Sequence, residues 1–190
     1  MAETPSYRIC HICKQRNDAK TRQCEHCQQP MPDKVEIFIS YSHGDIKLLA
    51  ELEKHLTILK RNGLGLLWTD QNIDKGSEWS PEILRHLDNA DIVLLLISAD
   101  FIASDFCYEK EMTRAMERHE RHEACVIPVI LRPCRWKSTP FAVLQAVPDN
   151  AKPVSTARNQ DEAFVEVTKR IQEVIEKRFD LKPPEKEQLW

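Results

Sequence analysis

The sequence has no long hydrophobic run, few glycines and no excess of basic residues. Its longest uninterrupted apolar stretch, Ile92–Ile97, is far shorter than the ~20 residues of a membrane-spanning helix. Only 4 of the 190 residues are glycine, and neither G-x-G-x-x-G nor G-x-x-x-x-G-K-S/T occurs, which excludes an ordinary dinucleotide-binding or P-loop protein. The formal net charge is −3, whereas binding of duplex DNA requires a basic surface.

A secretory leader is also lacking, since the first residues, Met-Ala-Glu-Thr-Pro-Ser, are not a basic segment followed by an apolar one. We therefore expect a cytoplasmic protein without membrane association. Its seven cysteines are not expected to form a disulfide framework, because cytosolic thiols stay reduced. The composition, with 42% hydrophobic and 30% charged residues, is typical of a folded domain with a small appendage.

Four of the cysteines form the pattern C-x2-C-x10-C-x2-C, namely Cys10, Cys13, Cys24 and Cys27. Two such pairs supply the tetrahedral thiolates that zinc prefers, and a segment this small has too few apolar residues to fold without the metal. Four thiolates leave no open position for water, so we expect a structural rather than a catalytic zinc. His11 and His26 lie within the pairs and could replace a cysteine, but the regular spacing favours solvent-exposed histidines.

Residues 1–30 resemble the bacterial zinc-ribbon family, including Asn17 between the pairs, although Lys14 and Gln28 stand where that family has glycine. The spacing is also that of the RanBP2-type finger, but Arg8 replaces that family's tryptophan, so ubiquitin or RNA recognition is not implied. We hypothesise a protein partner for this zinc ribbon. Nucleic acid is the weaker alternative because the net charge is acidic. Residues 31–34 form a short linker that contains a proline.

From residue 35 onward, apolar strand-like runs alternate with amphipathic helical segments. Strands are expected at 35–40, 65–68, 92–97 and 126–131, with a brief fifth strand near residues 153–154. Helices are expected between residue 46 and Gly63, from Ser80, over 104–119 and over 161–178. This alternation predicts a parallel sheet with helices on both faces. Ligands of such sheets bind at the carboxyl ends of the strands.

Several motifs of this second unit occur in the order found in a known family. They are Phe38-Ile39-Ser40-Tyr41-Ser42, Trp68-Thr69-Asp70, Gly76-x-x-Trp79, the run at 90–98, and Ser104-Asp105-Phe106-Cys107-Tyr108. With these motifs, residues 35–178 resemble the TIR (Toll/interleukin receptor) domain family, and residues 126–133 and Trp136 resemble later motifs of its bacterial branch. The resemblance implies an α/β fold, a flavodoxin-like five-stranded parallel sheet, with residues 70–79 as the so-called BB loop. Residues 179–190 are left as a C-terminal tail.

Many bacterial TIR domains cleave NAD+, release nicotinamide and act in anti-phage defence. The resemblance implies an NAD+ glycohydrolase or ADP-ribosyl cyclase-like enzyme here, with one catalytic glutamate. Glu111 precedes an aliphatic residue, as in the family pattern, whereas Glu109 precedes a lysine. We therefore favour Glu111, although the helical wheel alone does not choose between the two. The alternative is a non-catalytic module that signals by TIR–TIR self-association.

The resemblance also implies which residues contact NAD+. They are Tyr41, Ser42 and His43 after the first strand, Asp70 after the second, and Phe106, Cys107 and Tyr108 before the glutamate. Ser42 and Asp70 could equally stabilise turns, and His43 could be a solvent-exposed loop histidine.

One departure concerns the aromatic residue that lies four positions before the family's glutamate. Cys107 occupies that position here and Phe106 lies one residue further back. Either Phe106 or Tyr108 could therefore lie beside the nicotinamide. Family behaviour further implies that activity requires assembly, in which the BB loop of one subunit completes the pocket of a neighbour.

Overall fold

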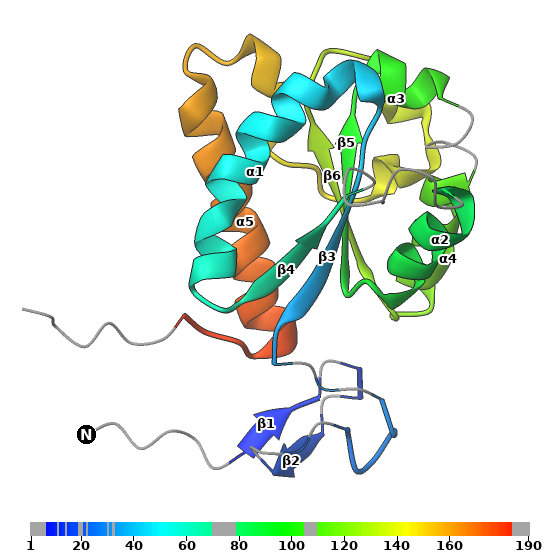
Figure 1. Cartoon of the computed structure of the whole chain (residues 1–190), viewed down its shortest axis with the longest axis vertical. Helices are drawn as coiled ribbons and strands as arrows, with labels where there is room; N and C mark the ends of the chain where they lie inside the picture. The colour runs from blue at the N-terminus through cyan, green and yellow to red at the C-terminus, as the bar shows by residue number, and fades with distance from the viewer. Residues whose placement is uncertain are drawn as a thin grey trace, which may run out of the picture.

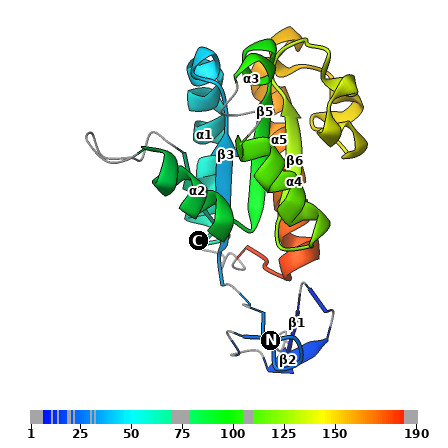
Figure 2. The same cartoon turned by 90° about the vertical axis from the view of Figure 1, so that its right-hand side faces the viewer.

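The computed structural model of the chain describes residues 7–10, 12–13, 15–18, 21, 23–29, 31, 33–69, 79–104 and 110–183. They form a small two-stranded unit and a larger α/β unit (Figure 1). The small unit contains the antiparallel strands β1 (Tyr7–Ile9) and β2 (Arg16–Asp18) and the segment that follows them. Figures 1 and 2 both show this unit at the end of the sheet where β3 begins.

The larger unit is built on a parallel sheet with the strand order β4-β3-β5-β6. These strands are β3 (Val35–Ser40), β4 (Gly65–Trp68), β5 (Ile92–Ile97) and β6 (Cys125–Ile130). Every residue of β5 is buried, because helices cover both faces of this central strand. The four strands agree with the apolar runs of the sequence to within one residue at each end.

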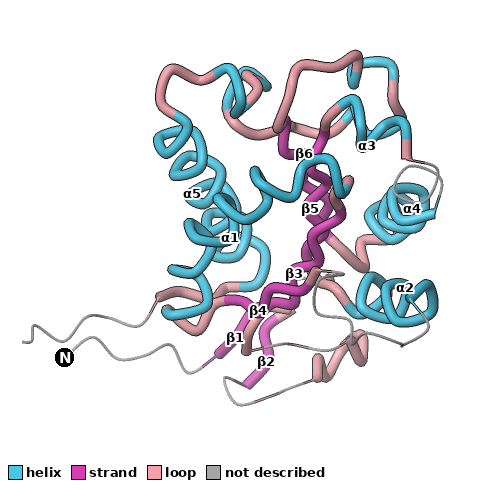
Figure 3. The backbone as a smooth tube through the Cα atoms, turned by 45° about the horizontal axis from the view of Figure 1, so that its top comes forward, coloured by secondary structure: helices cyan, strands magenta, loops and turns pink. Residues whose placement is uncertain are grey.

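Helices cover the sheet in two layers. On one face lie α1 (Ile46–Arg61) and α5 (Gln160–Phe179), and on the other lie α2 (Trp79–Asn89) and α4 (Thr113–Glu120) (Figure 3). The connections contain α3 (Ala99–Ala103) and the 3-10 turns η1 (His43–Asp45), η4 (Trp136–Ser138), η5 (Pro140–Val143), η6 (Asp149–Ala151) and η7 (Val154–Thr156). Among the helices described, none is long and apolar enough to cross a membrane.

Helix α1 ends at Arg61, and Gly63 forms the turn that stops it, as expected from the sequence. The N–H of Leu64 donates to the carbonyl of Leu59 at 2.9 Å, and the N–H of Gly63 donates to Lys60 at 3.1 Å. Gly63 has φ +69°, which is the left-handed backbone that this type of helix end requires and that glycine adopts without strain. The turn directs the chain into β4.

The fifth strand expected near residues 153–154 is wrong, because Val154 begins the 3-10 turn η7. The outer edge of β6 is already occupied. Val147 exchanges two hydrogen bonds of 2.8 Å with Pro128 and Ile130, and the N–H of Val126 donates to Nδ1 of His119 at 3.1 Å. Pro128 has no N–H to offer. Over the described residues the sheet therefore has four strands, and single residues complete its edge instead of a fifth strand.

The helix expected over 104–119 also differs at its start. Helix α3 begins directly after β5, because the hydroxyl oxygen of Ser98 accepts from the N–H of Phe101 at 3.0 Å. Ser104 has extended backbone angles, φ −85° and ψ 113°, and ends α3. Residues 105–109 lie outside the described ranges, and residues 110–112 form a π-helical turn that leads into α4.

At the amino end of the sheet, a buried arginine and an aspartate form hydrogen bonds with backbone groups. Nη1 of Arg118 donates to the carbonyl of Leu87 at 2.5 Å and to that of Ala90 at 2.7 Å, so it satisfies the C-terminal end of α2. Asp91 accepts from the N–H of Glu36 at 2.8 Å. Burial raises the pKa of the Asp91 carboxyl to about 6, although the hydrogen bond from Glu36 acts in the opposite direction.

The substitution Asp91→Asn is expected to make folding stability less dependent on pH. The pKa of Asp91 rises from 3.8 to about 6 on folding, so the folded state binds the proton more tightly. The contribution of Asp91 to wild-type stability therefore falls as pH rises between these two values, by at most about 3 kcal/mol, and the variant lacks this loss. Urea unfolding from about pH 4 to about pH 7 measures the effect. A stability difference between the two proteins that stays constant over this range would contradict the burial argument.

Candidate active site and candidate metal centre

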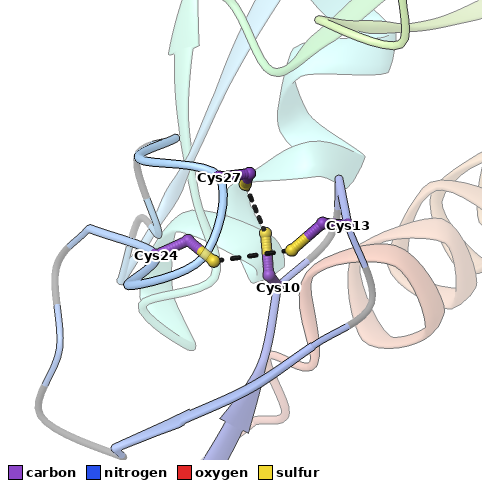
Figure 4. Close-up of side chains that lie close together, drawn as sticks. All are labelled: Cys10, Cys13, Cys24 and Cys27. Atoms are coloured by element: carbon purple, nitrogen blue, oxygen red, sulfur yellow. Dashed lines mark hydrogen bonds between the residues drawn. The ribbon is translucent and has the colours of Figure 1, made fainter.

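The four cysteines of the small unit converge on one point. Their sulfur atoms all lie within 4.8 Å of one another, with 3.6 Å between Cys10 and Cys27 and 3.5 Å between Cys13 and Cys24 (Figure 4). A tetrahedron of Zn–S bonds of about 2.3 Å places its sulfurs about 3.8 Å apart. Thiolates this close can all be ionised only around a cation, since like charges repel. The donor set therefore fits a metal ion.

An equivalent backbone hydrogen bond spans each of the two C-x-x-C pairs. The N–H of Cys10 donates to the carbonyl of Gln15 at 3.0 Å, and the N–H of Cys24 donates to the carbonyl of Gln29 at 2.8 Å. Cys10 and Cys24 are fully buried and form a small core with Met31. Because so little apolar surface is buried here, a bound ion would supply most of the stability of this unit.

The side chain of Asn17 connects the two pairs. It accepts from the N–H of Glu25 at 2.8 Å and donates to the carbonyl of Gln15 at 2.9 Å. Gln15 follows the first pair and Glu25 lies within the second, so one buried amide sets the spacing between them. His26 is exposed, as expected, and His11 lies outside the described residues.

At the carboxyl edge of the sheet, Ser40 and Glu111 form a buried hydrogen bond. Ser40 is the last residue of β3 and is 1% exposed, and Glu111 precedes α4 and is 5% exposed. The Ser40 hydroxyl donates to Oε2 of Glu111 across a sequence separation of 71. Glu111, Ala115 and Arg118 are buried and recur at helical spacing, so this side of the helix faces the sheet.

The helix is locally widened at this glutamate. Residues 110–112 are the described part of a π-helical turn that leads into α4, and Glu111 lies within this part. Such turns accommodate one extra residue and are frequent at functional sites. The irregular backbone and the buried carboxylate therefore coincide at the same position.

A second buried carboxylate lies at the same edge of the sheet. Asp45 accepts from the Ser98 hydroxyl at 2.5 Å and from Nε of Arg132 at 2.6 Å. Arg132 also donates to Asp100, and these hydrogen bonds raise the pKa of its guanidinium. A Cβ on Gly44 would lie 2.6 Å from the Asp100 carboxylate, so only glycine fits there without a shift. The cluster joins the segments that follow β3, β5 and β6.

Three of the residues expected to contact NAD+ are described, and they follow Ser40 directly. Tyr41 is buried, and its ring centroid lies 5.7 Å from that of the exposed His43. Ser42 is half-buried, and its side chain makes no capping hydrogen bond to η1, so the turn-capping alternative is not observed. The remaining candidates lie outside the described residues: Asp70, Phe106, Cys107, Tyr108 and the alternative Glu109.

Sequence reasoning missed Ser40 as the partner of Glu111, and it missed the cluster around Asp45. One signal for both was present, since a serine follows the apolar residues at the ends of β3 and β5. A buried hydroxyl at such a position requires a hydrogen-bond acceptor. The acceptor comes from a distant segment, so hydrophobic periodicity does not identify it.

Two cavities bounded by described residues lie elsewhere. One of about 520 Å³ is lined by residues of α1 and α5, including His55 and Thr168. Another of about 580 Å³ is lined by residues of both units, including Ile12 of the small unit and Glu36 and Arg118 of the α/β unit. Neither is lined by the carboxyl-edge pair. The candidate active site therefore rests on the buried pair and the strand ends rather than on these cavities.

Comparison with known proteins adds the following similarities. The sequence model of a family described as TIR domain matches residues 37–167. Protein y4lF of Sinorhizobium fredii (strain NBRC 101917 / NGR234), described as uncharacterized, is 50% identical over 137 residues, or 72% of this chain and 42% of that protein. The chain thus spans less than half the length of this curated relative.

Solved structures are similar at low sequence identity. The TIR domain of the Toll-related receptor TRR-2 from Hydra magnipapillata has a TM-score of 0.44 and 19% identity over 58% of this chain and 78% of that one. The TIR domains of the activated Roq1 resistosome recognizing XopQ have a TM-score of 0.45 and 17% identity, over 79% of this chain and 86% of that one. The RPS4 and RRS1 TIR domain heterodimer has a TM-score of 0.47 and 13% identity, over 76% of this chain and 99% of that one.

The substitution Gln28→Gly is expected to stabilise the small unit by about 1 kcal/mol. Gln28 has φ 60°, in the left-handed region that favours glycine, and it stands where zinc ribbons have glycine. The rate at which the four thiols react with a chromogenic disulfide reports opening of this unit and should fall. The neighbouring Gln29→Gly is the matched control and should accelerate the reaction, because Gln29 has no positive φ to relieve. Equal effects of the two substitutions would contradict this explanation.

Proposed function

Since the chain belongs to the TIR domain family, we propose that it cleaves the nicotinamide–ribose bond of NAD+, with Glu111 as the catalytic residue. The family includes NAD+-cleaving enzymes and signalling scaffolds. The observation that carries the proposal is a buried carboxylate, hydrogen-bonded to Ser40, at the edge of the sheet where ligands of parallel sheets bind. Ser42 and His43 follow Ser40 directly and are proposed to contact the substrate.

One carboxylate is chemically sufficient for this reaction. The nicotinamide of NAD+ is a cationic pyridinium, so it leaves as a neutral molecule and needs no proton donor. As the bond breaks, positive charge develops on the ribose, as in the oxocarbenium-like state of glycoside hydrolysis. A fixed anion beside the ribose stabilises this state more than the ground state. Water can then attack to give ADP-ribose, or the adenine of the same molecule can attack to give a cyclic isomer.

The burial of Glu111 favours an enzyme over a scaffold. Removing a carboxylate from water is costly, and such groups concentrate where chemistry requires them. A buried acid can also be structural, as Asp45 is beside Arg132, but Glu111 stands at the position that matches the catalytic glutamate of the family. In the commoner family spacing the aromatic residue lies four positions before the glutamate, whereas Phe106 lies five positions before Glu111. A π-helical turn accommodates one extra residue, so this spacing is compatible with the turn at 110–112.

Assembly is the second part of the proposal. We propose that copies of the chain associate through residues 70–79 and that this association activates NAD+ cleavage in a cellular defence response. Residues 70–78 lie outside the described ranges, so the support for this step is the family alone. Gel filtration would compare the size of the protein in its active and inactive states, and the active protein should elute as the larger species.

The four cysteines are proposed to hold a structural Zn²⁺. The distances between their sulfurs and the burial of Cys10 and Cys24 support a closed four-thiolate site, in which the ion would replace a hydrophobic core. This zinc ribbon lies at the end of the sheet where β3 begins (Figure 1), whereas Ser40 ends that strand. We therefore propose that the ribbon recruits a protein partner and does not contribute to the NAD+ site.

The substitution Glu111→Gln is expected to reduce nicotinamide release by about 10²–10³-fold, because it removes the anion and keeps the shape of the side chain. Chromatography of the products from NAD+, at protein concentrations that permit association, measures the rate. Glu109→Gln is the matched control and should keep near wild-type activity. A loss in Glu109→Gln alone would move the catalytic role to that residue. A wild-type protein that associates and releases no nicotinamide would favour the scaffold.

The purified protein is expected to contain one equivalent of zinc, which Cys24→Ser should lose. Elemental analysis gives the stoichiometry, and limited proteolysis should then cut the ribbon while the α/β unit stays intact. Cys134→Ser is the matched control, because Cys134 packs against the core of the α/β unit. Retention of zinc in Cys24→Ser, or its loss in Cys134→Ser, would contradict the proposed ligand set.

A further inference from the structure

Two serines lie at the carboxyl ends of neighbouring strands. Ser40 ends β3 and Ser98 follows β5, and both are essentially inaccessible to solvent. Each donates a hydrogen bond to a buried carboxylate, Ser40 to Glu111 and Ser98 to Asp45. The two pairs therefore share their chemistry and lie at the same end of the sheet, but on opposite sides of it, because Ser40 pairs with Leu95 and Ser98 lies three residues beyond.

The surroundings of the two pairs differ. Asp45 also accepts from Arg132 at 2.6 Å, and Ser98 caps α3 by accepting from the N–H of Phe101 at 3.0 Å. That pair belongs to a structural cluster with its own cation. The pair at Glu111 instead joins a strand end to the π-helical turn at 110–112, which is the irregular part of the helix.

The burial of Ser40 limits what its hydroxyl can do. Ser40 is 1% exposed and its hydroxyl donates to Glu111, so we assign the serine to the support of the carboxylate and not to attack on the substrate. A hydroxyl buried in an apolar strand is costly unless it donates to an acceptor, and Glu111 supplies that acceptor. A hydrogen bond to a carboxylate is in turn stronger than one between neutral groups.

Resting on the proposed function, we infer that Ser40 is a positioning residue: its hydroxyl fixes the Glu111 carboxylate against the end of β3 in the orientation that NAD+ cleavage requires. A glutamate has several rotatable bonds, and a widened helical turn restrains its backbone less than a regular one. The hydrogen bond from Ser40, which belongs to the rigid sheet, adds a restraint on the carboxylate. An anion held in place before the reaction stabilises the developing ribose cation without reorganisation.

The variant Ser40→Ala is expected to lower kcat by about ten- to hundredfold and to leave KM within about threefold, because the restraint acts on the transition state. Ser40→Thr keeps the hydroxyl and should recover most of the lost rate. Ser98→Ala is the matched control. It removes the equivalent hydroxyl from the structural cluster, so it should lower the melting temperature while kcat stays within about twofold.

A second readout does not depend on turnover. In protein labelled with ¹³C at the glutamate carboxyl, the Glu111 signal is identified by its absence in Glu111→Gln. It should shift in Ser40→Ala and stay in place in Ser98→Ala. Absence of nicotinamide release from the wild-type protein would refute the proposed function, and the carboxyl signal would still decide on Ser40. An unshifted signal, an unchanged kcat in folded Ser40→Ala, or an equal loss in Ser98→Ala would overturn the inference.

Discussion

A carboxylate buried at the end of an apolar strand is stable only when hydrogen bonds or a cation compensate for its lost hydration. Asp45 accepts hydrogen bonds from Ser98 and Arg132, and Glu111 accepts one from Ser40. The carboxyl edge of the sheet thus carries two buried acids with different partners. Asp45 joins the segments that follow three strands, whereas Glu111 joins the end of β3 to the start of α4, at the edge where ligands of parallel sheets bind.

The two ends of the sheet carry different features, because all its strands run in the same direction. At the amino end, Arg118 satisfies the last carbonyls of α2, and Asp91 accepts from the backbone of β3. The cysteine-bearing unit also lies at that end (Figure 1). Because a parallel sheet collects its carboxyl ends at the opposite edge, this unit and the Ser40–Glu111 pair lie at opposite ends of β3. An influence of one on the other has to pass through the sheet or through a partner.

Much of the fold was predictable because its signals are local. Each strand of the sheet is an apolar run with turn residues at its end, and the buried side of α1 recurs at helical spacing up to Gly63. The absence of a fifth strand near residues 153–154 was not predictable. Residues 153–154 resemble a short strand, but Val147 and the side chain of His119 already satisfy the edge of β6, and neither contact leaves a periodic pattern. The start of α3 was missed because the capping role of Ser98 depends on its neighbours.

The sequence by itself determined the chemical inventory: four cysteines at ligand spacing, a parallel α/β unit, and a choice between Glu109 and Glu111. These follow from spacing and from the order of residues along the chain. Only the tertiary structure decided that Glu111 is buried beside Ser40 and that Asn17 joins the two cysteine pairs. A hydrogen bond between residues 71 positions apart depends on how the strands and helices pack together. Such a contact therefore leaves no signal in the local pattern of either segment.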